Sequence, residues 1–388
     1  MYFRFLYPTK IMKKILVYAY LNKNLGDDLF IHMLAQRYPD HMFYVTKRKS
    51  YARAVFKGYR NLKFSFFLEM LDKLMKLEIR LQKSGRIKKD YFSAFFKKYF
   101  MRFDAAVYIT GSAFVQRKSG QAMEGIDRLR KKKELSKRFF LIGANFGPYE
   151  DAAFRNGYNE VFSSLDDSCF RDTYSVTELG AAENKRYAPD IVFNLDPTPY
   201  LCKSEQKNIL VSVIDCERFG RPVPLKKQRV AYETKVAQIC KKLHEKGYRI
   251  TLMSFCDMQK DDASCRRIAN RIRNDIQVDV DLYSYNGNMT EALKKFAQAD
   301  GIIASRFHAM ILGWVFGKTV LPLVYDHKME TVIRDFDFSG LWENILSIEQ
   351  LDADKAASYL TGGEQMNIER IKKEATKQFA AFEQFLKS

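Results

Sequence analysis

Cysteine pairs and long apolar runs are absent from this chain of 388 residues, and each absence excludes a class of protein. The six cysteines form neither a CxxC pair nor a spacing typical of zinc ligands, which favours free thiols in a reducing compartment (Cys169, Cys202, Cys216, Cys240, Cys256 and Cys265). No window approaches the roughly 18 uncharged apolar residues of a membrane-spanning helix. Residues 1–10 are too short and too interrupted for a signal peptide. We therefore expect a cytoplasmic protein.

The common signatures of cofactor and metal sites are missing as well. The chain has no GxGxxG fingerprint, no P-loop and no HExxH sequence. Neither a serine, histidine and aspartate set nor a carboxylate-rich cluster is visible. We expect neither a cofactor nor a metal.

Basic charge is abundant, and it is unevenly distributed. The formal net charge is +19. Residues 47–103 contain 17 basic and four acidic residues, a net charge of +13 in under a sixth of the chain. This concentration favours contact with a polyanionic ligand or surface.

Short apolar runs alternate with segments of helical periodicity in both halves of the chain. The expected strands cover 15–20, 42–45, 105–109, 139–143 and 168–170, then 209–214, 249–253, 278–282, 301–304 and 320–324. The clearest helices of the second half are expected over 229–246, 259–273, 289–298 and 306–316. This alternation is typical of βαβ units with parallel sheets. It predicts an α/β fold of two Rossmann-like domains that face a cleft.

Prolines mark the expected join between the domains. Pro189, Pro197 and Pro199 interrupt the periodicity between residues 187 and 208. We place an N-terminal domain, expected on the acceptor side, at 1–195 and a C-terminal domain, expected to bind the donor, at 205–345. Residues 346–388 are expected to form helices, ending in a charged amphipathic helix over 367–386, which could pack back across the boundary.

The segment 62–103 is expected to be a helical insertion in the first domain. One helix has its apolar residues at helical spacing, with lysines and arginines on another face (Phe67, Met70, Leu71, Leu74, Leu77 and Leu81, with Lys73, Lys76, Arg80 and Lys83). A second helix aligns aromatic residues (Phe92, Phe95, Phe96, Tyr99, Phe100 and Phe103). Basic, aromatic, amphipathic helices of this kind bind anionic bilayer surfaces. The alternative is an ordinary helix pair that buries its apolar face. No recognised nucleic-acid-binding fold accompanies the charge, so we expect no nucleic-acid partner.

The strongest candidate for chemistry is the segment that follows the expected strand at 301–304. Arg306 and His308 fall in the first turn of the next helix, where free backbone N–H groups and the helix dipole favour anions. Arg306 can clamp a carboxylate or a phosphate, and His308 can titrate near neutral pH. Position alone leaves a structural role for this histidine open. Lys328, after the next expected strand, would enter the same crevice.

Other strand ends add candidates for the lining of the cleft. In the first domain these are Asn24, Gly26 and Asp27, then Gly111 and Ser112, then Asn145 and Gly147. Asp27 or its neighbour could cap a helix or act as a carboxylate in the cleft. Arg171 and Asp172 follow a further strand and could pair with each other, or Arg171 could reach the cleft as a second anion clamp. Three cations from separate strand ends suit a small substrate with both a carboxylate and a phosphate.

At these residues the chain resembles the polysaccharide pyruvyl transferase family. The matching signatures occur in family order (Asn24–Asp27, Gly111–Ser112, Gly143 with Gly147–Pro148, Arg171–Asp172, Ala188–Asp190, Ser305–His308 and Tyr325–Lys328). The resemblance implies a GT-B-like fold and transfer of pyruvyl from phosphoenolpyruvate, as a ketal, to a sugar of a surface polysaccharide. The sequence departs from the family pattern at Thr110–Ser112 and Ala144–Phe146, which leaves the acceptor sugar open.

The resemblance also implies roles for single residues. Arg171, Arg306 and Lys328 would hold the phosphate and carboxylate of phosphoenolpyruvate, and His308 would be the general acid. Asp27 or Asp172 would be the base. The acceptor could be assembled on a lipid diphosphate, which would agree with the basic 47–103 segment. Two alternatives are a GT-B glycosyltransferase that uses a nucleotide sugar and a non-catalytic protein that binds membranes or polyanions.

Overall fold

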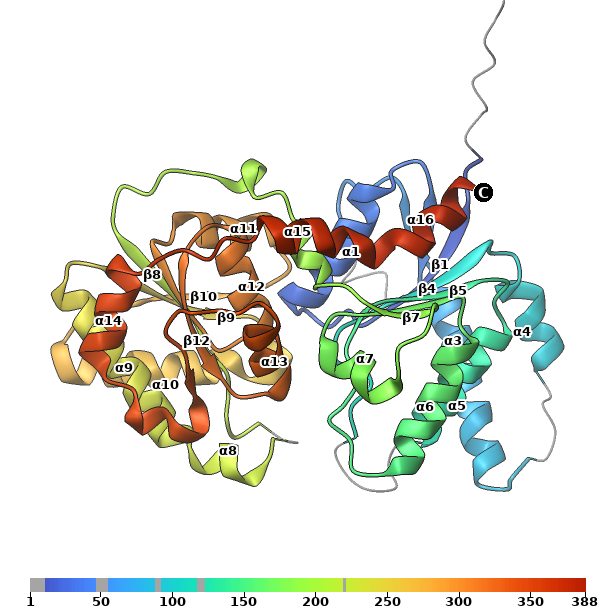
Figure 1. Ribbon diagram of the computed structural model, residues 1–388, viewed down its shortest axis with the longest axis horizontal. Helices are drawn as coiled ribbons and strands as arrows, with labels where there is room; N and C mark the ends of the chain where they lie inside the picture. Colours follow the sequence, from blue (N-terminus) through green and yellow to red (C-terminus); the bar gives the residue numbers. More distant parts are fainter. Residues whose placement is uncertain (1–10, 47–54, 88–91, 117–122, 219–220) are drawn as a thin grey trace, which may run out of the picture.

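The computed structural model describes residues 11–46, 55–87, 92–116, 123–218 and 221–388. These residues form two α/β units, each built on one sheet, which lie side by side (Figure 1). The first sheet has the order β3-β2-β1-β4-β5-β6-β7, and the second has the order β10-β9-β8-β11-β12-β13. Neighbouring strands in both sheets are parallel. The predicted fold class of two parallel-sheet α/β domains is confirmed.

The strands are short and mostly apolar. Those of the first sheet are β1 Lys14–Ala19, β2 Met42–Val45, β3 Leu62–Phe64, β4 Ala105–Ile109, β5 Phe139–Ala144, β6 Asp167–Phe170 and β7 Lys185–Tyr187. Those of the second are β8 Asn208–Ser212, β9 Arg249–Ser254, β10 Asp281–Ser284, β11 Gly301–Ala304, β12 Thr319–Val324 and β13 Glu343–Asn344.

The helices connect successive strands. In the first unit they are α1 Leu25–Arg37, α3 Phe66–Lys83, α4 Ser93–Phe100, α5 Met123–Glu134, α6 Ala152–Ser164 and α7 Thr173–Leu179. In the second they are α8 Val223–Lys227, α9 Arg229–Glu245, α10 Asp261–Ile276, α11 Met289–Gln298, α12 Phe307–Val315, α13 His327–Asp335 and α14 Ala353–Gly362. None of the helices among the described residues is long and apolar enough to cross a membrane.

Both sheets have the same internal strand order, which determines where a ligand can bind. Counted from its first strand, each sheet reads 3-2-1-4-5-6, and the first sheet adds a seventh strand at its edge. In this order the connections leave a crevice at the carboxyl ends of the two central strands. These strands are β1 and β4 in one unit and β8 and β11 in the other. Every residue of β8 and β11 is buried, as expected for parallel strands covered by helices on both faces.

Most expected strands are present within one or two residues of their predicted bounds, and the differences lie at sheet edges. The strands β3, β7 and β13 were not expected, because runs of two or three residues give no readable alternation. The edge strand β10 begins at Asp281, three residues later than predicted.

The first part of the join between the units, residues 188–195, is mostly buried, whereas residues 203–207 before β8 are exposed. The join contains two 3-10 turns, η1 Ile191–Asn194 and η2 Thr198–Tyr200. The ring of Phe193 lies 6.4 Å from that of Trp314 and 5.3 Å from that of Phe336, both in the second unit. The chain that carries Asp190 is therefore packed between the units and is not an exposed linker.

The last helices return to the first unit (Figure 1). They are α15 Glu369–Ala375, the 3-10 turn η5 Thr376–Phe379 and α16 Ala380–Lys387, where one continuous helix was expected. The ring of Phe382 lies 5.4 Å from the rings of both Tyr38 and Phe140. The C-terminal segment thus contributes to the hydrophobic core of the first unit.

We predict that Phe382→Ala will destabilise the protein by about 3–5 kcal/mol, because truncation of a buried phenylalanine leaves a cavity. Glu383→Gln on the same helix is the control. Its carboxylate pairs with Arg37, and the two side chains are 29% and 32% exposed, so its loss should cost no more than about 1 kcal/mol. Chemical denaturation of both variants measures the difference. Equal stability would show that the last helix does not support the core.

Candidate active site

A buried ion pair joins the ends of β6 and β7. Nη1 of Arg171 donates to Oδ2 of Asp190 at 2.9 Å, and the two side chains are 2% and 1% exposed. The N–H of Val192 donates to Oδ1 of the same carboxylate at 2.9 Å. Burial raises the pKa of Asp190, but His308, Arg171 and this N–H outweigh burial and hold the pKa below its ordinary value. Asp190 is therefore a carboxylate at neutral pH.

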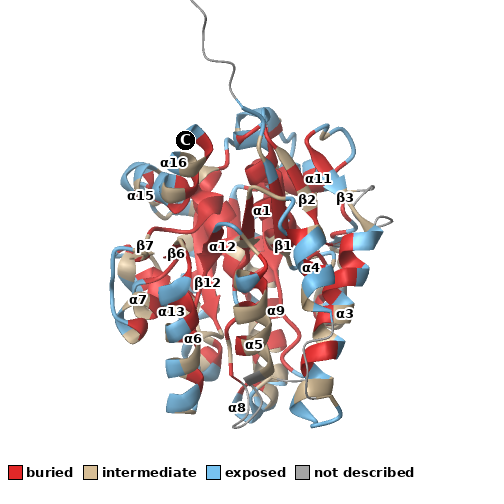
Figure 2. Ribbon diagram, turned by 90° about the vertical axis from the view of Figure 1, so that its right-hand side faces the viewer, coloured by how far each residue is buried: buried red, intermediate tan, exposed pale blue. Residues whose placement is uncertain are grey.

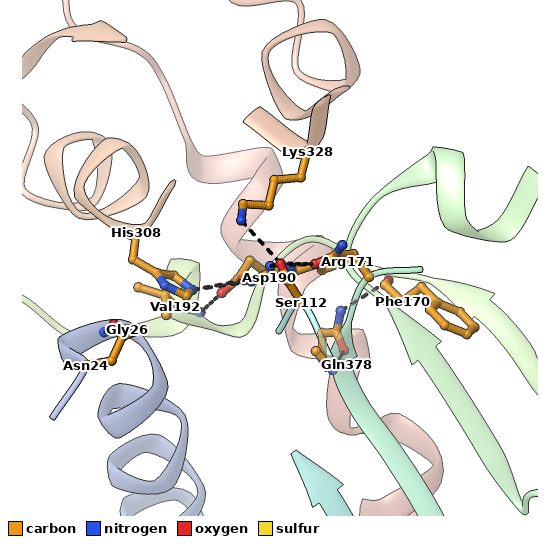
Figure 3. A network of polar contacts seen from close by, with 12 residues as sticks. Asn24, Gly26, Ser112, Phe170, Arg171, Asp190, Val192, His308, Lys328 and Gln378 are labelled. Atoms are coloured by element: carbon orange, nitrogen blue, oxygen red, sulfur yellow. Dashed lines mark hydrogen bonds and ion pairs between the residues drawn. The ribbon is translucent and has the colours of Figure 1, made fainter. Parts of the chain in front are cut away.

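His308 approaches this pair from the second unit (Figure 3). It lies in the first turn of α12, as predicted. Its Nε2 is 3.5 Å from Oδ2 of Asp190 and 3.4 Å from Nη1 of Arg171. Burial lowers the pKa of His308; Asp190 raises it, and the charges of Arg171 and Lys328 lower it further. Nε2 can accept from the arginine when neutral or donate to the carboxylate when protonated, so the site accommodates both protonation states.

Gly26 provides the space that His308 occupies. A Cβ at this position would lie 1.8 Å from Nδ1 of His308. Gly26 is the second residue of α1, after Asn24, whose side chain accepts from the Gly26 N–H and caps the helix. A glycine is needed at this position because the two units approach each other closely.

The second nitrogen of Arg171 binds two predicted cleft residues. Nη2 donates to Oδ1 of Asn145 at 2.7 Å and to Oγ of Ser112 at 3.3 Å. Ser112 in turn accepts from Nζ of Lys328 at 3.3 Å. Gly111 allows the approach, because a Cβ there would lie 3.0 Å from both Nη atoms. The structure thus brings two of the predicted cations, Arg171 and Lys328, to one hydroxyl (Figure 3).

Asp27 belongs to the same electrostatic environment. Burial raises its pKa from the ordinary value to about 7, against the opposing charges of Arg171, Lys328 and Arg306. The nearby carboxylate of Asp190 contributes to the increase. An aspartate with this pKa can exchange a proton at neutral pH.

Protein side chains already bind the guanidinium of Arg306, whereas its predicted role is to bind the phosphate or carboxylate of a substrate. Its Nε donates to Oδ2 of the buried Asp261 at 2.9 Å, and its Nη2 donates to Oδ1 of the same side chain. Its Nη1 donates to Oε1 of Gln259 at 2.6 Å. Arg306 therefore faces these partners, while its charge still acts on Asp27.

A second group of cations surrounds Tyr325. The guanidinium carbon of Arg221 lies 4.2 Å from the centre of the tyrosine ring, and Nζ of Lys328 lies 5.8 Å from it. Burial raises the pKa of Tyr325, but Lys328, Arg221 and Arg306 lower it to about 8. Nε and Nη2 of Arg221 are buried and have no hydrogen-bond partner among the described residues. These groups could bind an anion.

Two predicted site residues, Asp172 and Gly147, form hydrogen bonds that stabilise the structure around the site. Oδ1 of Asp172 caps α7 by accepting from the Ser175 N–H at 2.8 Å and from its hydroxyl at 2.6 Å. Arg171 and Asp172 do not form the pair considered from the sequence. Gly147 lies further along the loop after β5, where its N–H donates to the carbonyl of Phe114 at 2.8 Å.

Three residues of the cluster were not predicted as site residues. Asp190 lies in the Ala188–Asp190 signature, which by itself assigns no role to the carboxylate. Arg221 carries no local signal. Gln378 lies near the end of the chain, is fully buried, and donates to the carbonyls of Phe170 and Ala188 at 3.3 and 2.5 Å while accepting from Gly143 at 2.9 Å. Among the described residues, no three histidine, cysteine or acidic side chains are placed to hold a metal ion.

Comparison with known proteins identifies the family. The family model described as polysaccharide pyruvyl transferase matches residues 24–327, which include the site residues from Asn24 to Tyr325 and end one residue before Lys328. The chain belongs to the polysaccharide pyruvyl transferase family. It is therefore a transferase. A curated relative, the amylovoran biosynthesis protein AmsJ of Erwinia amylovora, is 24% identical over 337 residues, 80% of this chain and 76% of the relative.

Solved structures confirm the GT-B-like fold. S. aureus TarM, solved in a complex with UDP among other ligands, has a TM-score of 0.56 at 11% identity and covers 97% of this chain and 100% of its own. S. aureus MnaA, solved with UDP, has a TM-score of 0.53 at 12% identity and covers 96% and 94%. Anabaena HepE, solved with UDP and glucose, has a TM-score of 0.51 at 10% identity and covers 95% and 100%. At these identities the likeness establishes the fold alone.

We predict that Gly26→Ala will displace His308 from Asp190 and Arg171, since the added methyl would overlap its ring. Because displacement exposes the imidazole, its pKa should rise towards the ordinary value of about 6.5. Histidine titration by NMR measures the change, and the chain has only five histidines. Gly362→Ala is the control, because a Cβ there meets nothing within 4 Å. An unchanged titration of His308 in Gly26→Ala would contradict the packing described above.

Proposed function

We propose that the protein transfers the pyruvyl group of phosphoenolpyruvate to two hydroxyls of a sugar in a surface polysaccharide, as a ketal. The observation that carries the proposal is the meeting of Arg171, Lys328 and His308, from both units, at the crevice, together with family membership. Arginine and lysine provide charge for a phosphate and a carboxylate, and the histidine provides a titratable group beside them. No bound cofactor is required, because phosphoenolpyruvate is itself the activated donor.

In the proposed reaction His308 protonates the methylene carbon of phosphoenolpyruvate, which becomes a methyl group and leaves an oxocarbenium-like centre at the adjacent carbon. One sugar hydroxyl adds to that centre and loses its proton to a base. The carbon–oxygen bond to phosphate then breaks, and a second hydroxyl closes the ring with loss of its own proton. Inorganic phosphate and the ketal are the products.

Donor binding is assigned to the cations at the crevice. Arg171 and Lys328 would hold the phosphate and carboxylate, because both already converge on Ser112. The partner-free nitrogen atoms of Arg221 would add a third contact. Arg306 would contribute charge, with its orientation fixed by Asp261. Electrostatic stabilisation of the leaving phosphate is the expected effect.

Asp27 is the preferred base. Its pKa of about 7 makes a substantial fraction of the carboxylate available near neutral pH. Asp172 is the weaker candidate, because its carboxylate is committed to the cap of α7. Asn24, Ser112 and Asn145 would line the acceptor side. We further propose that the acceptor is a repeat unit carried on a lipid diphosphate and that the enzyme works in the cytoplasm at the inner face of the membrane.

We predict that the protein incubated with phosphoenolpyruvate and a panel of galactosides, mannosides and N-acetylhexosamines will release phosphate and form an acid-labile pyruvylated sugar. His308→Ala should lower the rate about 10²–10⁴-fold, the usual contribution of a general acid. Phosphate release with mass spectrometry of the sugar measures both. The exposed His244→Ala is the matched control and should keep the wild-type rate. Wild-type turnover in His308→Ala would exclude the general-acid role, and transfer from a UDP-sugar alone would favour a glycosyltransferase.

We predict two pH-dependent limbs with different origins. In the free protein, the protonated fraction of His308 falls as the pH rises through a pKa below the ordinary value, because burial and two cations lower that pKa. The ionised fraction of Asp27 rises through about pH 7, above the pKa of His308, so the fully active form is a minor species and the kcat/KM profile should rise up to the His308 pKa and fall above about pH 7. In the profile of kcat, the fall that reports His308 should occur at higher pH, because the negative charges of the bound donor offset the positive charges of Arg171 and Lys328.

Asp27→Asn should remove the rising limb and leave only a fall through the pKa of His308. The pH profiles of the wild-type protein, Asp27→Asn and the control His244→Ala measure these limbs. A His308 limb at the same pH in kcat and kcat/KM would contradict the proposed coupling between the donor and this histidine.

A further inference from the structure

Two helices of the first unit leave large apolar side chains in solvent. They are α3 and α4, which lie close together in Figure 2. The exposed fraction reaches 68% for Phe66 and 51% for Leu77. We define the α3–α4 face by its exposed apolar members, which are Phe66, Phe67, Met70, Leu77, Phe92, Phe95 and Met101.

These side chains form one surface. On α3, the exposed positions 66, 70, 73, 77 and 80 follow helical spacing and therefore lie along one stripe. The ring of Tyr99 on α4 lies 4.9 Å from that of Phe67 on α3 and 5.0 Å from that of Phe95. The stripe thus continues from one helix to the other. Other apolar residues, such as Leu71 and Phe96, are buried and attach the two helices to the unit.

Within the segment itself, the exposed charges of this face have one sign, and the partly exposed acids beside it belong to α5, where Glu124 pairs with Arg80 and Asp127 pairs with Lys83. Glu69, Asp72 and Glu78 are 7%, 7% and 3% exposed, so their carboxylates are turned inward. Nζ of Lys73 lies 2.8 Å from Glu69, and Nζ of Lys76 lies 2.5 Å from Asp72. Within the described part of 62–103, the exposed charged residues are all basic (Lys63, Lys73, Arg80, Lys83, Arg86, Lys97, Lys98 and Arg102).

We propose that the α3–α4 face docks on an anionic bilayer surface. Exposed phenylalanine, leucine and methionine can enter the boundary between headgroups and acyl chains, and the basic residues beside them can contact anionic headgroups. The inward orientation of the acids removes repulsion by those headgroups. A second copy of the chain is the less favourable occupant, because a twofold contact would bring two basic rims together.

This inference does not rest on the pyruvyl transfer reaction. Bilayer binding requires neither donor nor acceptor, so it can be measured without turnover. Docking would place the enzyme where a lipid-linked acceptor is found. If the protein does not bind membranes, the transfer reaction is still tested by its own assay. A failure of that assay, in turn, does not affect the membrane proposal.

The test is flotation of the full chain with vesicles of phosphatidylcholine, with and without phosphatidylglycerol. We expect binding to the anionic vesicles at ~0.1 M salt and loss of most of it at ~1 M, where the Debye length falls from about 10 to about 3 Å. Lys97→Glu, Lys98→Glu and Arg102→Glu combined should reduce binding at least ~10-fold, since each basic residue near the surface contributes to attraction. The control combines Lys203→Glu, Lys227→Glu and Lys294→Glu, exposed residues of the join and the second unit with the same change in net charge.

A second variant tests the apolar contribution. Phe66→Ser with Leu77→Ser should reduce binding without lowering thermal stability, because both side chains are exposed. Three results would overturn the proposal: no binding to anionic vesicles at low salt, equal losses in the charge variant and its control, or a dimer in solution that the Phe66 and Leu77 changes dissociate while vesicles stay unbound.

Discussion

The buried pair between Arg171 and Asp190 constrains the whole crevice. Both side chains are almost fully enclosed, so each charge depends on the other and on the few groups within reach. Removal of one partner from such a pair costs about 3–5 kcal/mol, because it leaves an uncompensated buried charge. Nη2 of Arg171 donates to Asn145 and Ser112, and Oδ2 of Asp190 faces His308. One ion pair thereby sets the positions of side chains from both units.

The same pair links the protonation of His308 to the occupancy of the site. In the free protein, Arg171 and Lys328 lower the pKa of the histidine, while Asp190 raises it. An anionic donor at these cations would cancel part of their effect, and the contribution of Asp190 would then dominate. His308 would therefore bind its proton mainly when the donor is present, and it would stay neutral in the empty site. Asp27, whose pKa depends on the same cations, should respond in the same direction.

The sequence predicted those parts of the structure that depend on local patterns. Apolar runs such as 301–304 became central strands, and the turn with Arg306 and His308 became the start of α12, because strand burial and helix initiation are encoded within a few residues. The partners of these residues are encoded elsewhere. The contact of Asp261 with Arg306 spans 45 positions, and that of Asp190 with His308 spans 118. Neither contact lies within one helix or strand, so no local pattern in the sequence indicates it.

Gln378 illustrates how a distant residue supports the crevice. It lies in the last 3-10 turn, yet its amide binds Gly143 at the end of β5, Phe170 before Arg171, and Ala188 before the segment of Asp190. A buried amide whose donor and acceptor groups are used in this way holds three chain segments in register. Phe379 and Phe382, which follow Gln378 in the sequence, anchor the turn against Tyr38. The C-terminal segment can therefore fix the ion pair without touching either of its charged groups, and the geometry of the crevice depends on the last helices as much as on the strands that end there.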